Sequence, residues 1–486
     1  MGDKSQLVDA ICVSALGFSS LLLLAMPCYG AFFFTVAVGA IVLGVCLFAI
    51  FANKKTIQFG HWLAASVLLD YAAGTLFSFS SSDSIARAMD AARVWPALCE
   101  CLALVYIASL LLLMFDNVVK AAFYPKPEAL SPNASLFLIL ICTSLIVIAI
   151  LHGDIGFMGN HSDDTHHVSI LGSLASVASI PLLGLCGYAL PTEKRSNKWW
   201  LILFCTIAVF MIVCVSGRRN FGASIILFAF GYVLAGGARS ASTIRIVLGA
   251  SVFIVVGYLG STYFYSLRTA GYMFASATGV SASQASILDR MAFANKILGD
   301  RQRYASILSS YQQNVTERSF NIMYLADLVY HDKNARYGYG GNLWREIRVT
   351  IPSVLDSNKQ DLLDSGANEE SFVNPRFGIP VLDCPNSILT AGMGDYGPIG
   401  AIFYPLGFVL LIYLANGILR RLSGDFVELS LFMTLSISAI LFVPDVELST
   451  YLAMVRDSVI LFVVFGAAYF VTIKLLPGTI LRPQSL

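Results

Sequence analysis

The stretch CVSGRRNFGASIILF, residues 214 to 228, joins two long apolar runs through a turn that contains Arg218 and Arg219. About twenty nearly uncharged residues lie on each side of the arginine pair, which is the length that a helix needs to cross a bilayer. The whole chain has the same character, because 57% of its 486 residues are hydrophobic and only 13% are charged. A soluble domain has roughly 25% charged residues. The sequence therefore predicts a polytopic membrane protein.

The apolar runs predict an all-α fold with about twelve transmembrane helices. Charge between the runs is sorted by side, and this sorting predicts the orientation of the chain. Fourteen Lys and Arg residues lie at the termini or after even-numbered runs, and five lie in the other short loops. Both termini are therefore expected in the cytoplasm, with Arg218 and Arg219 on the outer face. The predicted spans are 7–26, 30–51, 59–79, 96–116, 134–151, 169–190, 199–217, 220–236, 246–265, 398–416, 429–444 and 458–475.

One long polar segment, residues 266–397, separates the ninth and tenth predicted spans and carries twelve Lys or Arg and thirteen Asp or Glu residues. A segment of this length is sufficient for a small domain. The sequence thus divides into helices 1–9 (1–265), a helical outer loop domain (266–397) and helices 10–12 (398–486). Apolar residues recur at helical spacing in 285–311, which predicts a helix there.

A second helix is predicted in the stretch YGYGGNLWREIRVTIPSVL, residues 337 to 355. Trp344, Ile347 and Ile351 would share one face of it, with Arg345 and Arg348 on another. This pattern is typical of a helix that lies on a membrane surface. An ordinary amphipathic helix in a soluble lobe would show the same pattern, and the sequence leaves both interpretations open.

The arginine pair is the first candidate site. Charged groups at membrane depth are costly, so they indicate a function by default. A guanidinium group matches a phosphate group well in geometry and charge, and a lipid diphosphate presents its phosphates at this depth. The alternative is that Arg218 and Arg219 only anchor the protein at the interface.

The second candidate site is DCPNSILTAGMGDYGPIGAIF, residues 383 to 403, at the close of the polar segment. Glycines allow the backbone and a ligand to approach closely, and Asp383 and Asp395 bracket this part of the segment. A flexible loop without further function is the alternative interpretation. The glycines in question are Gly392, Gly394, Gly397 and Gly400.

Three features in this order resemble the bacterial O-antigen polymerase and ligase superfamily. They are the outer arginines, the long late loop, and Asn386-Ser387 separated by nine residues from Gly397 and by two more from Gly400. Ligases carry a catalytic histidine where this chain has Asn386. Wzy-type O-antigen polymerases lack that histidine, and they carry stretches similar to IPSVLDSNKQ, residues 351 to 360, and to LTAGMGDYGPIGAI. The sequence is therefore identified as similar to a Wzy-type polymerase, which implies a fold of the GT-C type.

The resemblance implies an inverting, metal-independent glycosyltransferase without a cofactor. Such an enzyme transfers a growing glycan from undecaprenyl diphosphate to the non-reducing end of the next lipid-linked repeat unit. Positive charge would stabilise the leaving diphosphate, and a carboxylate would act as general base. Asp383 or Asp395 is the expected base, with Asn386 beside it in the catalytic site. The expected diphosphate ligands are Arg218, Arg219, Arg268, Arg345 and Arg348.

The expected partners are the undecaprenyl-diphosphate-linked oligosaccharide, the lipid bilayer and a chain-length regulator protein, with no nucleic acid. The expected location is the bacterial inner membrane, with the active site facing the periplasm. Three alternatives remain: an O-antigen ligase or O-oligosaccharyltransferase, a transporter of lipid-linked oligosaccharides, and a non-catalytic assembly partner. The histidine- and aspartate-rich loop 152–167 matches no standard zinc spacing, so it is expected to be a solvated loop rather than a metal site.

Overall fold

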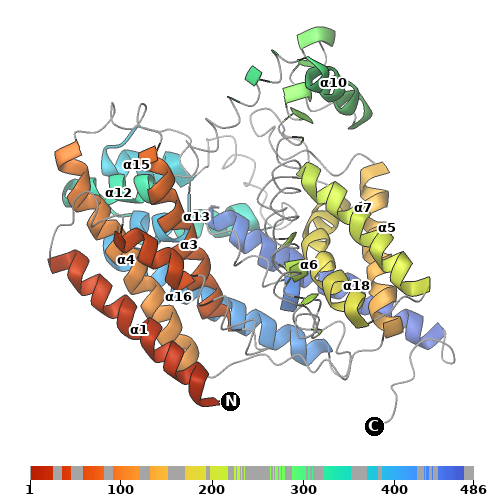
Figure 1. The fold of residues 1–486 in the computed structure, drawn as a ribbon, viewed down its shortest axis with the longest axis horizontal. Helices are drawn as coiled ribbons and strands as arrows, with labels where there is room; N and C mark the ends of the chain where they lie inside the picture. Colours follow the sequence, from red (N-terminus) through yellow and green to blue (C-terminus); the bar gives the residue numbers. More distant parts are fainter. Residues whose placement is uncertain are drawn as a thin grey trace. The chain divides into compact units, whose positions relative to one another are not determined.

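In the computed structural model, all of the regular secondary structure in the described residues is helical (Figure 1). Isolated residues are also described at 47, between 224 and 309, and between 432 and 441. The continuous described ranges are 2–25, 35–44, 58–80, 91–119, 132–151, 170–192, 197–216, 287–300, 321–351, 369–380, 386–423 and 447–475.

Long apolar helices make up most of the described chain. They are α1 (Gly2–Ala25), α3 (Phe59–Ser80), α4 (Ala91–Val119), α5 (Pro132–Leu151), α6 (Ile170–Thr192), α7 (Asn197–Ser216), α16 (Ile388–Ser423) and α18 (Leu448–Leu475). The shorter elements are α10 (Ile287–Gly299), α12 (Asn321–His331), the 3-10 turn η4 (Asp332–Asn334), α13 (Gly341–Thr350) and α15 (Glu369–Phe377). The predicted all-α class is confirmed for the described part of the chain.

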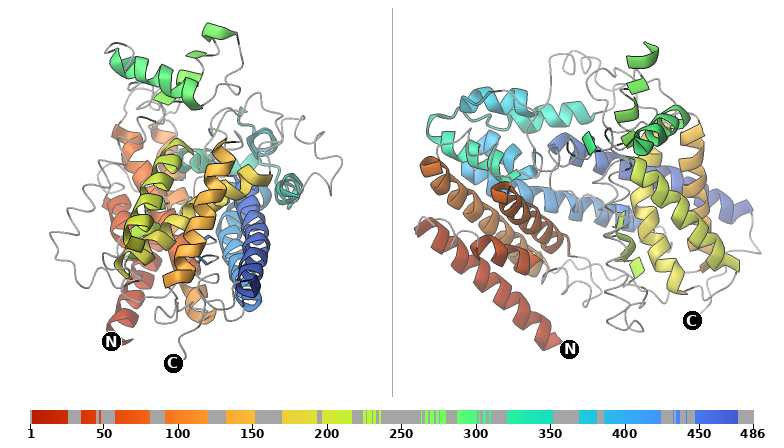
Figure 2. Two further views of the ribbon diagram at one scale, coloured as in Figure 1. Left: turned by 90° about the vertical axis from the view of Figure 1, so that its right-hand side faces the viewer. Right: turned by 45° about the horizontal axis from the view of Figure 1, so that its top comes forward.

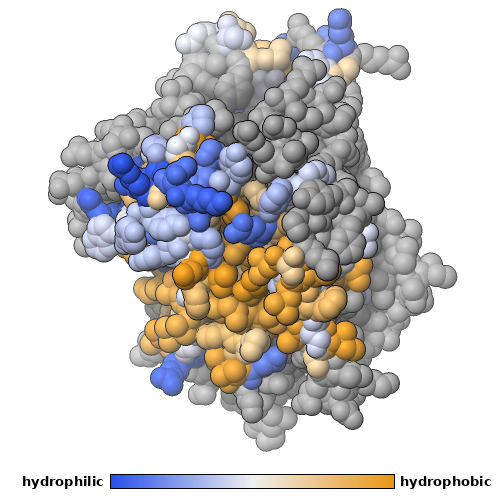
Figure 3. All heavy atoms as spheres, turned by 90° about the vertical axis from the view of Figure 1, so that its left-hand side faces the viewer, coloured by the Kyte–Doolittle hydropathy of each residue, from blue (hydrophilic) through white to orange (hydrophobic). Residues whose placement is uncertain are grey.

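Three of the described helices are long and apolar enough to cross a membrane, namely Trp95–Val119, Ile388–Leu422 and Leu448–Ala467. Their outward surface agrees with that role, since Phe403 and Leu414 of α16 are more than half exposed. Figure 3 shows a broad apolar area on one face, with a hydrophilic area beside it. The count of twelve spans stays a prediction, because the predicted runs 220–236, 246–265 and 429–444 lie largely outside the described residues.

The chain divides into two compact units, each built from segments that are distant in sequence. Unit 1 contains Met1–Tyr124, Asn314–Gly417 and Ile440–Arg456. Unit 2 contains Pro125–Gln313, Ile418–Ala439 and Asp457–Leu486.

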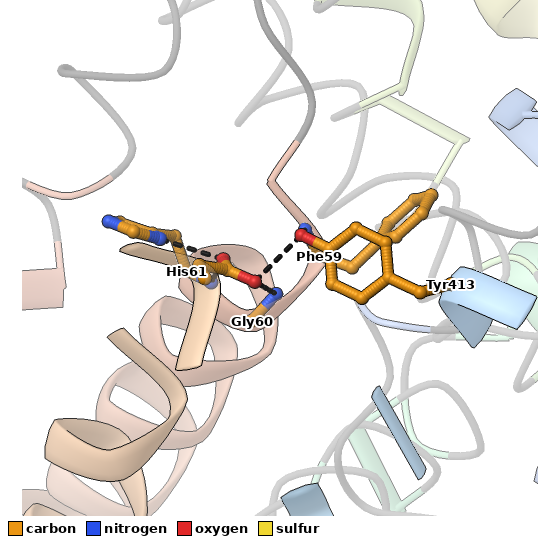
Figure 4. A network of polar contacts seen from close by, with 5 residues as sticks. Phe59, Gly60, His61 and Tyr413 are labelled. Carbon is orange, nitrogen blue, oxygen red and sulfur yellow. Dashed lines mark hydrogen bonds and ion pairs between the residues drawn. The ribbon is translucent and has the colours of Figure 1, made fainter. Parts of the chain in front are cut away.

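One end of unit 1 is tied together by the buried carboxylate of Asp116, near the end of α4 (Figure 4). Its Oδ1 and Oδ2 accept hydrogen bonds from the backbone N–H groups of Gly60 (3.2 Å) and His61 (2.7 Å). These groups lie in the first turn of α3, where a helix supplies no partner of its own. The Tyr413 hydroxyl on α16 donates to Oδ1 at 2.7 Å, and His61 Nδ1 lies 2.7 Å from Oδ2. Asp116 therefore caps α3 and links it to α4 and α16.

The opposite end of unit 1 carries the polar helices. Tyr71 lies twelve residues, about 18 Å, further along α3 than Phe59, and its hydroxyl is 2.6 Å from Ser387 Oγ at the start of α16. The thiol of Cys101, in the first half of α4, donates to the carbonyl of Ile322 in α12. We call α12, η4, α13 and α15 the lobe; Figures 1 and 2 show α12 and α15 over the ends of α3 and α4.

Unit 2 is a second helical bundle, in which α5, α6 and α7 lie side by side (Figures 1 and 2). Glycines let α6 approach the described residues between 224 and 232. A Cβ atom on Gly187 would lie 2.1 Å from the Phe228 carbonyl oxygen, and one on Gly231 would lie 2.0 Å from that of Gly184. Small residues at helix contacts are typical of membrane bundles, where close packing replaces the hydrophobic effect.

The predicted loop domain, 266–397, stays a prediction, and its described helices fall in both units. Its helix α10, which confirms the helix predicted in 285–311, belongs to unit 2 and packs through Ala294 and Ile297 on Leu267. The lobe helices of the same segment belong to unit 1. The physical reason is that α12 buries its apolar residues on α3 and α4.

Candidate functional site

The site is built around the N-terminus of α13. Its N-cap residue, Gly340, has no side chain with which to cap the helix. Asp395 of α16 supplies the cap instead: Oδ1 accepts from the N–H of Asn342 and Oδ2 accepts from the N–H of Leu343, both at 2.9 Å. The Tyr404 hydroxyl also donates to Oδ2. Asp395 is 0% exposed, so its contacts give it a structural role as a helix cap, worth about 1–2 kcal/mol.

Asp395 stands directly before a break in α16. Tyr396 and Gly397 leave the helical conformation, and Gly397 has φ 64° and ψ −151°, a region open only to glycine. Across the break, Gly392 and Gly400 pack backbone to backbone, since a Cβ on Gly392 would lie 2.2 Å from the Gly400 oxygen. A Cβ on Gly394 would likewise lie 2.6 Å from the side chain of Val373. These glycines therefore serve close packing within a helix–break–helix unit. The stretch, for which the sequence left a flexible loop as the alternative, is helical from Ile388 onward except at the break.

The start of α16 is fixed by a reciprocal cap, in which Ser387 Oγ accepts from the Thr390 N–H (3.2 Å) and Thr390 Oγ1 accepts from the Ser387 N–H (2.8 Å). This arrangement follows the logic of a capping box. The preceding residue, Asn386, is buried, and its Oδ1 has no hydrogen-bond partner among the described residues. A buried amide oxygen without a partner costs about 1–3 kcal/mol, so Asn386 is a candidate to bind a polar group.

Helix α13 turns its polar face inward. Asn342 and Glu346, one turn apart on the same face, are buried, whereas Trp344 is 61% exposed. Both amide atoms of Asn342 and the Oε1 of Glu346 lack a hydrogen-bond partner in the described part of the chain. Buried polar groups are normally hydrogen-bonded, so this face of α13 has unused binding capacity.

Glu346 belongs to a group of four carboxylates, the glutamate cluster, formed by Glu346, Glu369, Glu370 and Glu447. The first three are buried. Glu369 Oε1 accepts from the Thr390 hydroxyl at 3.2 Å, and Glu346 Oε2 accepts from the Ser449 N–H at 3.1 Å. Among the described residues, no three His, Cys, Asp or Glu side chains are arranged as a metal site.

Burial and mutual repulsion change the acidity of this cluster. Burial, with the nearby Glu447 as the second cause, raises the pKa of Glu346 to about 7. Burial, and then the neighbouring Glu346 and Glu447, raises the pKa of Glu369 well above its usual value. Carboxyl groups this close cannot all be ionised. Burial and the neighbouring carboxylates therefore favour the neutral form of Glu369, and they favour the neutral form of Glu346 up to about pH 7.

Guanidinium groups flank the cluster. Arg345 Nη2 donates to Ser371 Oγ at 3.4 Å, and its guanidinium lies 5.7 Å from the centre of the Phe372 ring. Arg376 stacks on the same ring at 3.5 Å. Burial lowers the pKa of Arg345, but an arginine remains charged at neutral pH. Arg456 Nη1 donates to the carbonyl of Thr350 at the end of α13.

Several predicted site residues come together in unit 1. Asn386, Asp395, the four glycines, Arg345 and Arg348 lie on α13 or along the first part of α16. The other candidates, Arg218, Arg219, Arg268 and Asp383, lie outside the described residues, as does the loop 152–167. Their predicted roles stay predictions.

Glu346, Glu369 and Glu370 were not among the residues predicted from the sequence. The spacing of Asn342 and Glu346 could have indicated Glu346, because it puts two polar residues on the face of α13 opposite Trp344. No such signal exists for Glu369 and Glu370, because adjacent acidic residues at the start of a short helix are usual on a surface.

Comparison with known proteins gave no match: no family model, no curated protein and no solved structure is significantly similar to this chain.

Proposed function

We propose that this protein is a membrane glycosyltransferase that polymerises lipid-linked oligosaccharide repeat units of an O-antigen, capsule or exopolysaccharide. It would transfer the growing glycan from undecaprenyl diphosphate to the non-reducing end of a new lipid-linked unit. The observation that carries the proposal is the position of Glu346 on a polar lobe at one end of an apolar helical unit. Its carboxylate is buried, and its Oε1 has no hydrogen-bond partner among the residues that the structure describes. The motif order given above supports the substrate class.

The proposed chemistry needs one base and a stabilised leaving group. An acceptor hydroxyl attacks the anomeric carbon of the donor, the bond from that carbon to the diphosphate breaks, and the hydroxyl proton passes to Glu346. A general base works best when its pKa is near the working pH, and the pKa of Glu346 is raised to about 7 by burial. A single carboxylate is sufficient for inversion in one step.

Glu346 is a better base than Asp395 on geometric grounds. Both oxygens of Asp395 already accept hydrogen bonds from the first turn of α13. To accept a proton from the substrate, Asp395 would have to give up these hydrogen bonds, and α13 would lose its cap. Glu346 lies on the helix that Asp395 caps. In this account Asp395 is a positioning residue, and Asp383 remains an alternative base.

The departing diphosphate would be held by arginines. Arg218 and Arg219 are the proposed main ligands, with Arg268, Arg345 and Arg348 as further ligands. Fixed guanidinium groups stabilise the charge that develops on a leaving group, as a metal ion does in other enzymes. The proposal therefore requires no cofactor.

The proposed location is the bacterial inner membrane, with twelve spans, cytoplasmic termini and the lobe in the periplasm. Unit 1 is compatible with this arrangement. Asp116 contacts the first turn of α3, whereas the contacts of α3 and α4 with the start of α16 and with the lobe lie at the opposite ends of these two helices. By the charge rule, the start of α3 is cytoplasmic, so the lobe would be periplasmic.

A transporter of lipid-linked oligosaccharide is the second candidate. One observation favours it: buried carboxyl groups with raised pKa values, such as Glu369, are typical of proton-coupled transport. A ligase or O-oligosaccharyltransferase is less well supported, because Asn386 replaces the histidine of ligases.

The test uses purified protein in lipid nanodiscs, a lipid-diphosphate-linked repeat unit and a chelator, with products separated on a gel. A ladder of regularly spaced products is expected from the wild type. The ladder should be lost in Glu346→Gln and retained in Asp327→Asn, a partly buried carboxyl of α12 outside the glutamate cluster. No ladder from well-folded wild-type protein would refute the polymerase and favour transport.

A further inference from the structure

A row of aromatic rings crosses from the lobe onto α16. The ring centres of Tyr337 and Tyr339 are 6.3 Å apart, those of Tyr339 and Tyr396 are 6.4 Å apart, and those of Tyr396 and Tyr404 are 6.3 Å apart. We call these four residues the tyrosine row. Tyr339 is 75% exposed and Tyr396 is 44% exposed, so two of the four side chains in the row are accessible to a ligand.

The backbone holds this row in an unusual conformation. Tyr339 has φ 49°, a left-handed conformation that is rare for a bulky residue. It is maintained by hydrogen bonds at 2.9 Å from the Gly338 N–H to the Gly394 carbonyl and from the Tyr339 N–H to the Asp395 carbonyl. Strained residues of this kind persist only where the surroundings fix them, and they concentrate at ligand sites.

The surroundings of the row combine polar and apolar groups. Lys333 and Arg336, shortly before Tyr337 in the chain, are exposed, and the Tyr337 hydroxyl donates to Asp332 Oδ1 at 2.7 Å. At the other end, α16 continues with the exposed apolar residue Ile399. The tyrosine row thus lies where the polar surface of the lobe meets the apolar surface of α16.

We propose that the tyrosine row binds the pyranose rings of the glycan nearest to the lipid in the lipid-linked substrate, which rests on the proposed function. A pyranose ring has faces of C–H groups and an edge of hydroxyls. The C–H face fits the negative face of an aromatic ring, and the hydroxyls find partners in the polar groups beside it. The faces of the tyrosines repel anions, so the row suits the uncharged sugar and leaves the diphosphate to the arginines.

A membrane contact is the rival explanation, since tyrosines are enriched at membrane interfaces. The row differs from the apolar side chains of α16, because the exposed Lys333 and Arg336 shortly precede it in the chain and the backbone of Tyr339 is fixed by Asp395 and Gly394. An interfacial anchor needs no fixed backbone. The glycan is therefore the occupant that the observations favour.

The test measures retention of glycans on the full-length protein in nanodiscs. The probe is the glycan pool released by mild acid from the undecaprenyl-linked lipids of cells that make the protein. Tyr339→Asn, which tolerates positive φ, and Tyr396→Ala should each lower affinity about two- to tenfold. Tyr339→Phe should retain affinity. Tyr330→Ala, which removes an exposed tyrosine of α12 outside the row, should leave affinity unchanged.

Unchanged affinity in both Tyr339→Asn and Tyr396→Ala would overturn the proposal. So would a loss of thermal stability in these variants that appears only in lipid and leaves glycan retention intact, because that result identifies a membrane contact. The result of this binding test can be distinguished from the result of the polymerase test. Retention through the row without any product ladder refutes polymerisation alone, and a ladder with unchanged retention refutes the glycan-binding row alone.

Discussion

Replacing Glu346 with glutamine should make the protein more stable while slowing its reaction by about 10²–10⁴-fold. In the folded protein, burial raises the pKa of Glu346 from 4.5 to about 7. As pH rises between these two values, the unfolded state loses a proton that the folded state keeps, so the free energy of unfolding falls. Each unit of pKa corresponds to about 1.4 kcal/mol, which gives a loss of about 3 kcal/mol as an upper limit, complete above pH 7.

A glutamine resembles the neutral glutamic acid and carries no such cost. Glu346→Gln should therefore match the wild type near pH 4.5 and exceed its stability at pH 8. The corresponding rise in melting temperature is at most about 6–12 °C for a unit of this size. The assay is thermal unfolding in detergent micelles at pH 4.5, 6 and 8, followed by intrinsic fluorescence.

Asp327→Asn is the matched control for this experiment. Burial alone raises the pKa of Asp327 to about 6, so this variant should also gain stability at pH 8, but with its transition below pH 6. Only Glu346→Gln should lose polymerase activity. If Glu346→Gln is instead less stable than the wild type at pH 8, Glu346 is ionised and well partnered in the folded protein, and the reasoning is refuted.

Three further predictions concern the supports of the site. Asp395→Asn should weaken the α13 cap by about 1–2 kcal/mol and speed hydrogen exchange in that helix; unchanged exchange there would contradict the capping role. Gly392→Ala should destabilise the protein by about 1–3 kcal/mol, because the new Cβ meets the backbone of Gly400. Gly407 has open space around it, so Gly407→Ala should stabilise the protein by about 0.5–1 kcal/mol. Equal melting temperatures for the two variants would argue against the close contact of Gly392 and Gly400. Tags on both termini should be digested by protease only from the cytoplasmic side, and digestion of either tag from outside would disprove the proposed topology.

The apolar helices could be predicted from sequence because their signal is local. A run of about twenty apolar residues specifies a spanning helix whatever its neighbours are. Helix α4 appears where such a run was found, whereas α18 begins ten residues before its predicted run 458–475. The start of α16 was placed ten residues too late. Its glycines suggested a loop, but the reciprocal cap of Ser387 and Thr390 begins the helix before them.

The inner face of α13 could not be predicted by the same logic. Amphipathic patterns are interpreted on the assumption that charged residues face water, whereas here the polar side chains of Asn342 and Glu346 are buried. The role of Asp395 was equally hidden. Its partner, the first turn of α13, lies 53 residues earlier in the chain, and no local pattern records a cap made over that separation.

The central claim is that Glu346 is the general base of a polymerase, and the pH dependence of the initial rate tests it most directly. A base must be deprotonated to act, so the rate of product-ladder formation by the wild type should rise about tenfold per pH unit below pH 7 and level off above it. Glu346→Gln should be slower by about 10²–10⁴-fold, and its rate should not show this rise with pH. Asp327→Asn should retain the wild-type pH profile. A Glu346→Gln variant with the wild-type rate and the same rise of the rate up to pH 7 would contradict this role of Glu346.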